Sequence, residues 1–182
     1  MNEPPYETML TEIRADLAAA HRRARDHIAQ PGTWWDGAHR VSLMAETRNA
    51  VDCALCRERK AALSPAAVAG RHDSLGELPE IAVEIVHRIR TDPGRLTRSW
   101  YDGVIRSDLT PEQYVEIVSV VAHTVALDTF ARGIGIAPLA NVATGGRHAV
   151  AAPSARRPAR PGLGAVDRAA GPHRSRGRHL PA

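Results

Sequence analysis

The sequence predicts an all-α protein. Three observations predict this class: apolar residues recur at helical spacing, helix-capping signals mark several boundaries, and the alternating pattern of strands hardly occurs. The 182 residues suit one domain with a hydrophobic core. We expect an N-terminal helix in residues 1–32, a helical bundle in residues 33–140 and a tail in residues 141–182.

The first predicted helix covers about Glu7 to Gln30, and Pro31-Gly32 stops it. Its apolar positions fall at steps of three and four residues and are Met9, Ile13, Leu17, Ala20, Ala24 and Ile28. After a loop, a second helix is predicted from about His39 to Leu63. This second helix contains both cysteines of the chain.

Three further helices are predicted in the middle of the chain. A short one covers residues 65–69 and is followed by a polar connection. Pro79 at a first helical position opens the next, which Asp92-Pro93-Gly94 ends. A shorter helix follows at about residues 95–104.

The last predicted helix has the clearest start signal in the chain. Thr110 can cap it, and Gln113 can reach back to complete a capping box. The apolar, β-branched run that follows, taken alone, could be a strand. Its length to about Arg132 and Gly133 at the C-cap position favour a buried helix instead.

The basic character of the chain resides in its tail. Residues 141–182 hold eight arginines against one acid, Asp167, whereas the preceding residues hold 16 basic and 19 acidic side chains. The tail lacks large apolar residues, so we expect it to be disordered. Nucleic-acid binding by the tail is a weaker alternative, because no aromatic residue is interleaved for base stacking. Another hypothesis is that an out-of-frame reading of a GC-rich gene produced the tail.

The N-terminal residues and the hydropathy of the chain favour a cytoplasmic protein that does not enter a membrane. Glu3, Glu7 and Glu12 do not fit a secretory signal, and no apolar run approaches the roughly 20 residues that span a bilayer. Two cysteines only three residues apart do not form a disulfide scaffold. In a cytosolic protein, this spacing indicates redox or metal chemistry.

Within a continuous helix, the cysteines would belong to a polar stripe. Steps of three and four residues place Glu46, Asn49, Cys53, Cys56 and Lys60 on one face. Two thiols one turn apart can close a disulfide if their Cα atoms lie about 4.4–6.8 Å apart.

Charged neighbours would set the reactivity of these thiols. Lys60 and Arg57 each lie one turn after a cysteine, where a cation lowers a thiol pKa. Glu46 or Asp52 could accept a proton or position water. Either carboxylate could equally raise the thiol pKa by repulsion, and the sequence leaves both effects open.

The cysteine-bearing run from Val41 to Ser64 resembles that of the alkylhydroperoxidase D (AhpD) and carboxymuconolactone decarboxylase families, and residues 109–132 resemble the second helical half of the same fold. The resemblance implies an AhpD-like helical bundle and a thiol oxidoreductase that reduces alkyl hydroperoxides. It implies that Cys56 attacks the peroxide and that Cys53 resolves it as a disulfide. It also implies a homo-oligomer, often a trimer or a multiple of trimers, and a dithiol or lipoyl-type reductant, with no cofactor or metal.

Two positions depart from the family pattern. The family has His four residues after the second cysteine, where this chain has Lys60, and Glu about twelve residues before the first, where it has Val41. Those two residues form the proton relay in active members, and lysine is a poor proton shuttle at neutral pH unless it is desolvated. A replacement relay would come from Glu46, His72 and Lys60.

Two alternatives to the redox function stay open. Zinc could be held by Cys53 and Cys56 together with two of His39, His72 and His87, although no second C-x-x-C or H-x-x-x-H pair is present. We expect His87 to be a surface histidine, because it sits just off the apolar arc of its helix. Alternatively, the protein is a non-catalytic member of the superfamily that serves oligomerisation or partner binding.

Overall fold

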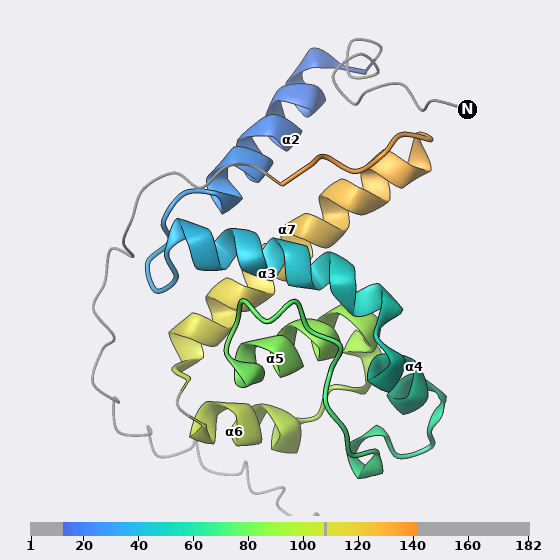
Figure 1. Cartoon of the computed structure of the whole chain (residues 1–182). Coiled ribbons are helices and arrows are strands. Elements are labelled where there is room, and N and C mark those ends of the chain that lie inside the picture. The colour runs from blue at the N-terminus through green and yellow to red at the C-terminus, as the bar shows by residue number, and fades with distance from the viewer. Residues whose placement is uncertain (1–12, 108, 142–182) are drawn as a thin grey trace, which may run out of the picture.

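The computed structural model describes residues 13–107 and 109–141 (Figure 1). Within these ranges the chain forms helices and no strand, which confirms the all-α prediction. The α-helices are α2 (Ala15–Ile28), α3 (Gly37–Asn49), α4 (Ala54–Ala61), α5 (Glu80–Thr91), α6 (Arg98–Arg106) and α7 (Pro111–Gly133). Short 3-10 turns are η2 (Ala50–Asp52), η3 (Pro65–Ala67) and η4 (Pro93–Arg95).

Helix α7 is the element around which the others pack. It contacts α2, α3 and α5, and Figure 1 shows α3 crossing in front of it. The apolar arcs of α3, α5 and α7 meet in the main core, whose members include Leu43, Met44, Ile85, Val86, Ile117, Val120 and Val121. Burying a side chain of this size contributes about 1.5–3 kcal/mol, so this core supplies the main driving force for folding.

Two ion pairs join α3 to α7 beside the core. Arg40 Nη1 lies 2.7 Å from Glu116 Oε1. Arg48 holds both carboxylate oxygens of Asp128, at 2.9 and 2.7 Å. Three of these four side chains are buried, so each pair fixes the register between the two helices.

By length and composition alone, α7 could cross a membrane, so the prediction that no run approaches that length was wrong for this helix. A core helix meets the same criterion. Eight residues of α7 are buried inside the protein, and two of them, Glu116 and Asp128, are the acidic partners of those ion pairs. These contacts are those of a core helix.

Most predicted helix boundaries lie within a few residues of the observed ones. The capping box of Thr110 and Gln113 is present, and α7 extends through Gly133, so its C-cap residue is Ile134 and not the predicted Gly133. Pro79 precedes α5 as its N-cap instead of occupying its first turn. The first helix begins at Ala15, with Arg14 as its N-cap residue, so the predicted helix through Ile13 and Arg14 is wrong. Residues 7–12 of that prediction and the tail beyond residue 141 lie outside the described residues.

The predicted continuous helix from His39 to Leu63 is wrong. Helix α3 ends at Asn49, and Cys53 adopts an extended conformation (φ −64°, ψ 125°) before α4 begins. A distant residue, Asp73, holds this break: its Oδ2 accepts a hydrogen bond from Ala54 N at 2.7 Å, and its carbonyl accepts one from Asn49 Nδ2 at 2.6 Å. Asp73 thus caps α4 from outside the local sequence.

Candidate functional site

The two cysteines lie at the start of α4, where residues from α3, from α5 and from the connection before α5 come together. Cys53 is the N-cap residue and Cys56 lies in the first turn. Both thiols are free, with exposed fractions of 0% for Cys53 and 4% for Cys56. The break in the helix, and not a continuous stripe, therefore positions both sulfur atoms.

Two histidines from separate segments face these sulfurs. His72 belongs to the connection before α5, and its Nδ1 lies 3.5 Å from Cys53 Sγ and 3.4 Å from Cys56 Sγ. His87 belongs to α5, and its Nδ1 lies 3.3 Å from Cys56 Sγ. Both imidazoles thus direct the same ring nitrogen at the thiols.

A carboxylate faces the other nitrogen of each histidine. His87 Nε2 lies 2.8 Å from Glu46 Oε1, and His72 Nε2 lies 2.8 Å from Glu84 Oε2. Glu46, from α3, is buried and also accepts hydrogen bonds from Leu75 N and Asn49 Nδ2. These bonds fix the carboxylate and, through it, the orientation of the His87 ring.

Glu84, the carboxylate beside His72, is also fixed by hydrogen bonds. Arg59 Nη1 lies 2.9 Å from Glu84 Oε2, and Trp100 Nε1 donates to Glu84 Oε1 at 3.2 Å. Although burial opposes it, hydrogen bonds from His72, Arg59 and Trp100 lower the pKa of Glu84 to about 2. The carboxylate is therefore ionised throughout the physiological range.

The two histidines differ in their protonation. Burial would lower the pKa of His72, but its contacts with Cys56, Glu84 and Cys53 raise that pKa to about 10. Burial lowers the pKa of His87, and the nearby charge of His72 lowers it further, against the opposing effect of Glu46. The site thus pairs an imidazolium at His72 with a neutral imidazole at His87.

The position of Cys53 at a helix N-terminus favours its thiolate. Burial raises the pKa of this thiol, but hydrogen bonds with the backbone of Cys56 and Asp73 and with the side chains of His72 and Cys56 lower it overall. Backbone N–H groups at the first turn of a helix stabilise an anion. These contacts favour the thiolate form of Cys53.

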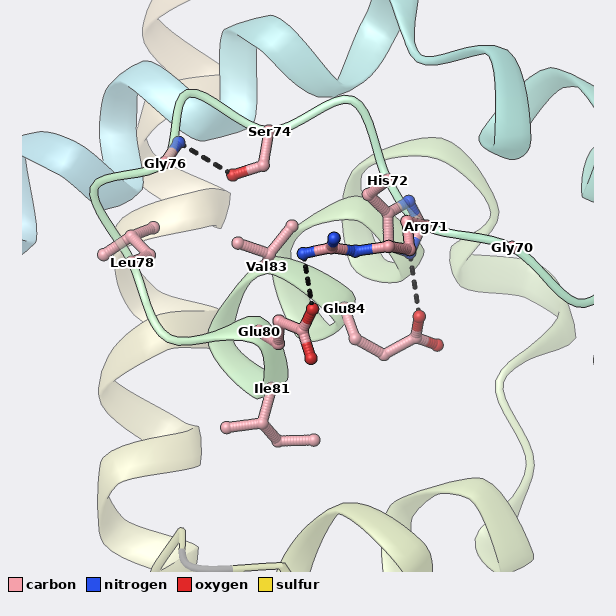
Figure 2. Close-up of a pocket in the computed structure, with 10 residues that line it drawn as sticks. All are labelled: Gly70, Arg71, His72, Ser74, Gly76, Leu78, Glu80, Ile81, Val83 and Glu84. Atoms are coloured by element: carbon pink, nitrogen blue, oxygen red, sulfur yellow. Dashed lines mark hydrogen bonds and ion pairs between the residues drawn. The ribbon is translucent and has the colours of Figure 1, made fainter.

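A cleft of about 720 Å³ opens beside the site (Figure 2). Its walls are the segment from Gly70 to Leu78 and the first turns of α5. Figure 2 shows His72 and Glu84 at one side of this cleft, joined by their hydrogen bond. Because the cysteines do not line the cleft, His72 stands between it and the sulfurs.

Four of the five predicted site residues come together, and one does not. Cys53, Cys56, Glu46 and His72 form the cluster described above. Lys60 is exposed on α4, and its carbonyl accepts a hydrogen bond from Arg95 Nη2 at 2.8 Å. The break at Cys53 turns α4 relative to α3, so the stripe predicted for a straight helix does not continue to Lys60.

The other charged neighbours proposed from the sequence also lie away from the sulfurs. Arg57 is exposed and donates to the carbonyl of Asp52. His39 lies in the first turn of α3, where its Nδ1 is 2.8 Å from Asp36 Oδ1. The imidazoles that face the thiols, His72 and His87, therefore come from other segments.

The sequence predictions included His87 only in the zinc alternative, and they missed Glu84 and Arg59. His87 was expected at the surface, and it is fully buried, with an exposed fraction of 0%. One signal was available, because Glu84 and His87 are three residues apart on α5 and so share a helix face with ionisable side chains. Arg59 gave no comparable signal.

Comparison with protein-family models, curated proteins and solved structures found no match to this chain. The function therefore has to be inferred from the chemistry of the site. Two thiols, two imidazoles and two carboxylates within direct contact define a candidate thiol-based centre. Such a set can transfer protons to and from a reactive sulfur, and it can also ligate a metal ion.

Proposed function

We propose that this protein is a dithiol oxidoreductase that reduces hydroperoxides through a Cys53–Cys56 dithiol–disulfide cycle. One observation carries the proposal: Glu46, His87 and Cys56 form a continuous chain, with contacts of 2.8 Å and 3.3 Å between buried side chains. A carboxylate that orients a neutral imidazole, which in turn contacts a thiol, is the arrangement that activates a nucleophilic cysteine.

The contacts of Glu46, His87 and Cys56 contain the two residue types of the AhpD relay, Glu and His, but at different sequence positions. The family relay uses Glu and His, where this sequence has Val41 and Lys60. Glu46 on α3 and His87 on α5 present the same two groups to Cys56 from a different direction. Membership of the AhpD-like superfamily, a bundle of the AhpD type, a cytoplasmic location and a trimer-based homo-oligomer remain part of this proposal.

In the first step, His87 accepts the Cys56 proton, and the thiolate attacks the terminal oxygen of a hydroperoxide ROOH. The O–O bond breaks, and the new S–O bond leaves Cys56 as a sulfenic acid. The leaving alkoxide takes the proton from His87 and departs as the alcohol ROH. The imidazole returns to its neutral form, hydrogen bonded to Glu46.

In the second step, the Cys53 thiolate attacks the Cys56 sulfur and forms the disulfide. Hydroxide leaves and takes a proton from the imidazolium of His72, so water is released. An external dithiol, such as a lipoyl-type group, then reduces the disulfide and becomes oxidised to its own disulfide, and the two protons that it gives up restore the starting state. The sum is ROOH plus dithiol giving ROH, water and the oxidised dithiol.

The cleft beside His72 is the route that we assign to the peroxide and the reductant. Its lining combines apolar side chains such as Ile81 and Leu78 with the polar pair of His72 and Glu84. An organic hydroperoxide has the same two characters. Gly70 and Gly76 also line the cleft.

Peroxide consumption in the presence of a dithiol tests the proposal. The native protein should turn over, and both Cys56→Ser and His87→Asn should lose activity. Lys60→Ala is the matched control, because Lys60 is exposed on the same helix, and it should retain activity. If one equivalent of peroxide leaves two free thiols and no intramolecular disulfide in the native protein, the proposed function is wrong.

A further inference from the structure

The four groups that surround the thiols have the composition of a metal-binding set. The Sγ atoms of Cys53 and Cys56 and the imidazole nitrogens of His72 and His87 all lie within 4.8 Å of one another. We propose that the reduced protein binds one Zn²⁺ ion, or a similar soft divalent cation, through these four side chains. The inference does not depend on peroxide reduction, because it needs only the reduced ligands.

The spacing of the four atoms fits tetrahedral zinc. With Zn–S of about 2.3 Å and Zn–N of about 2.0–2.1 Å, sulfur and nitrogen ligands of a tetrahedron lie about 3.6 Å apart. Three of the four sulfur–nitrogen separations are 3.5, 3.4 and 3.3 Å, and all four atoms lie within 4.8 Å of one another. The three close pairs are thus already near the tetrahedral spacing, and shifts of the side chains would bring the remaining pairs to it.

The surroundings of the histidines support the same ligand set. Each Nε2 lies 2.8 Å from a carboxylate oxygen, of Glu84 for His72 and of Glu46 for His87. A carboxylate that accepts the Nε2 proton fixes the plane of the ring and leaves Nδ1 as the metal-binding nitrogen. At His72 the ion would displace the Nδ1 proton as it binds. Here both Nδ1 atoms already point at the sulfurs.

The chemistry of the donors selects the type of ion. Two thiolates and two neutral imidazoles balance the charge of a divalent cation and favour Zn²⁺ over hard cations such as Mg²⁺ and Ca²⁺. Four protein ligands leave no open position, which is the arrangement of a structural site. The zinc alternative raised by the sequence is thereby narrowed to His72 and His87, since His39 lies with Asp36 elsewhere.

Metal binding would have two consequences for this protein. The ligands come from the start of α4, the connection before α5 and α5 itself, so one ion would tie the connection to both helices. The ion would also occupy both thiolates that the proposed peroxide cycle requires. We infer that zinc occupancy and peroxide reduction exclude one another, and that the disulfide form binds no zinc.

Titration of the full chain with Co²⁺ and Zn²⁺ tests the site. The reduced, metal-free protein should bind one Co²⁺ with the intense visible absorption of tetrahedral coordination and a thiolate charge-transfer band, and Zn²⁺ should displace it. Cys56→Ser and His72→Ala should abolish this spectrum. His39→Ala is the control that should leave it unchanged.

A second variant keeps the test valid if a ligand substitution prevents folding. Glu46→Gln retains all four ligands, and it should weaken Zn²⁺ binding by about 10- to 100-fold in competition with a chelating dye. Helical circular dichroism checks that this variant is folded. Absence of stoichiometric Co²⁺ binding by the native reduced protein, or a spectrum unaffected by Cys56→Ser, would overturn the metal site.

The two proposals at this site fail separately. A protein that binds one tetrahedral ion and does not consume peroxide supports the metal site and rules out the proposed function. A protein that turns over peroxide and binds no Co²⁺ rules out the metal site alone.

Discussion

The rings of His72 and His87 lie 4.3 Å apart, between centroids, and are tilted by 48°. Each ring places Nδ1 against a cysteine sulfur and Nε2 against a carboxylate. Their proximity means that a charge on His72 disfavours a second charge on His87. The two histidines therefore have different roles: His72 is a cation beside the sulfurs, and His87 is a proton acceptor.

This division predicts that Glu46→Gln impairs peroxide reduction while the fold survives. An amide can present its NH₂ group to Nε2, which favours the wrong tautomer of His87 and blocks proton transfer from Cys56. Loss of a general base typically lowers rates by about 10²–10⁴-fold, and we expect an effect in this range. Glu58→Gln, on an exposed turn of α4, serves as the control. Equal rates for the two variants would contradict the relay.

Lys60→His should not increase activity, although the sequence pattern suggests a histidine at this position. Lys60 is exposed, and the break at Cys53 directs this part of α4 away from Glu46. A histidine introduced there cannot enter the chain of Glu46, His87 and Cys56. Steady-state rates of the variant and the native protein should agree within about twofold, since surface changes away from such features have small effects. A large gain would show that the relay has been assigned to the wrong histidine.

The comparison of Lys60 with His87 shows which features of the site a sequence could predict. Local signals gave the helices, because caps such as Thr110 with Gln113 act on adjacent backbone groups. The break at Cys53 could not be predicted, since Asp73, 19 residues away from Ala54, holds it. His87 lies next to the apolar arc of its own helix, and only the approach of α3 and α4 buries it.

Asp73→Ala should destabilise the protein at the start of α4. It removes the side-chain oxygen that accepts from Ala54 N at 2.7 Å, and loss of such a cap costs about 1 kcal/mol. Asp73→Asn keeps an acceptor oxygen and should restore most of that stability. Urea denaturation measures both variants. If the two substitutions have equal effects, the side chain does not cap α4.

The charge of Asp36 should contribute stability that depends on pH. Burial raises the pKa of this carboxyl, but hydrogen bonds with His39 outweigh burial and lower the pKa below its usual value. A group with a lowered folded-state pKa stabilises the protein above its unfolded pKa, and this stability is lost as pH falls through the folded pKa. The contribution should thus be complete above about pH 5 and decline below about pH 4.

Asp36→Asn isolates this contribution, because an asparagine still caps α3 without a titrating carboxyl. The difference in unfolding free energy between the native protein and this variant should shrink as pH falls from 5 to 3, in denaturant titrations at fixed salt. A constant difference over that window would show that the charge of Asp36 does not stabilise the fold.

Gly32→Ala should be strongly destabilising, whereas Gly103→Ala should stabilise. A Cβ at position 32 would lie 1.5 Å from Glu116 Oε1 and 2.3 Å from Arg40 Nη1, so it would displace the buried pair that joins α3 to α7. Inserting a methyl group against such a packed pair costs about 1–3 kcal/mol. A Cβ at position 103, within α6, would meet no atom within 4 Å. Alanine there should contribute about 0.5–1 kcal/mol through its higher helix propensity. Thermal and urea unfolding of the two variants should therefore shift in opposite directions, and a tolerated Gly32→Ala would mean that the Arg40–Glu116 pair does not hold these helices together.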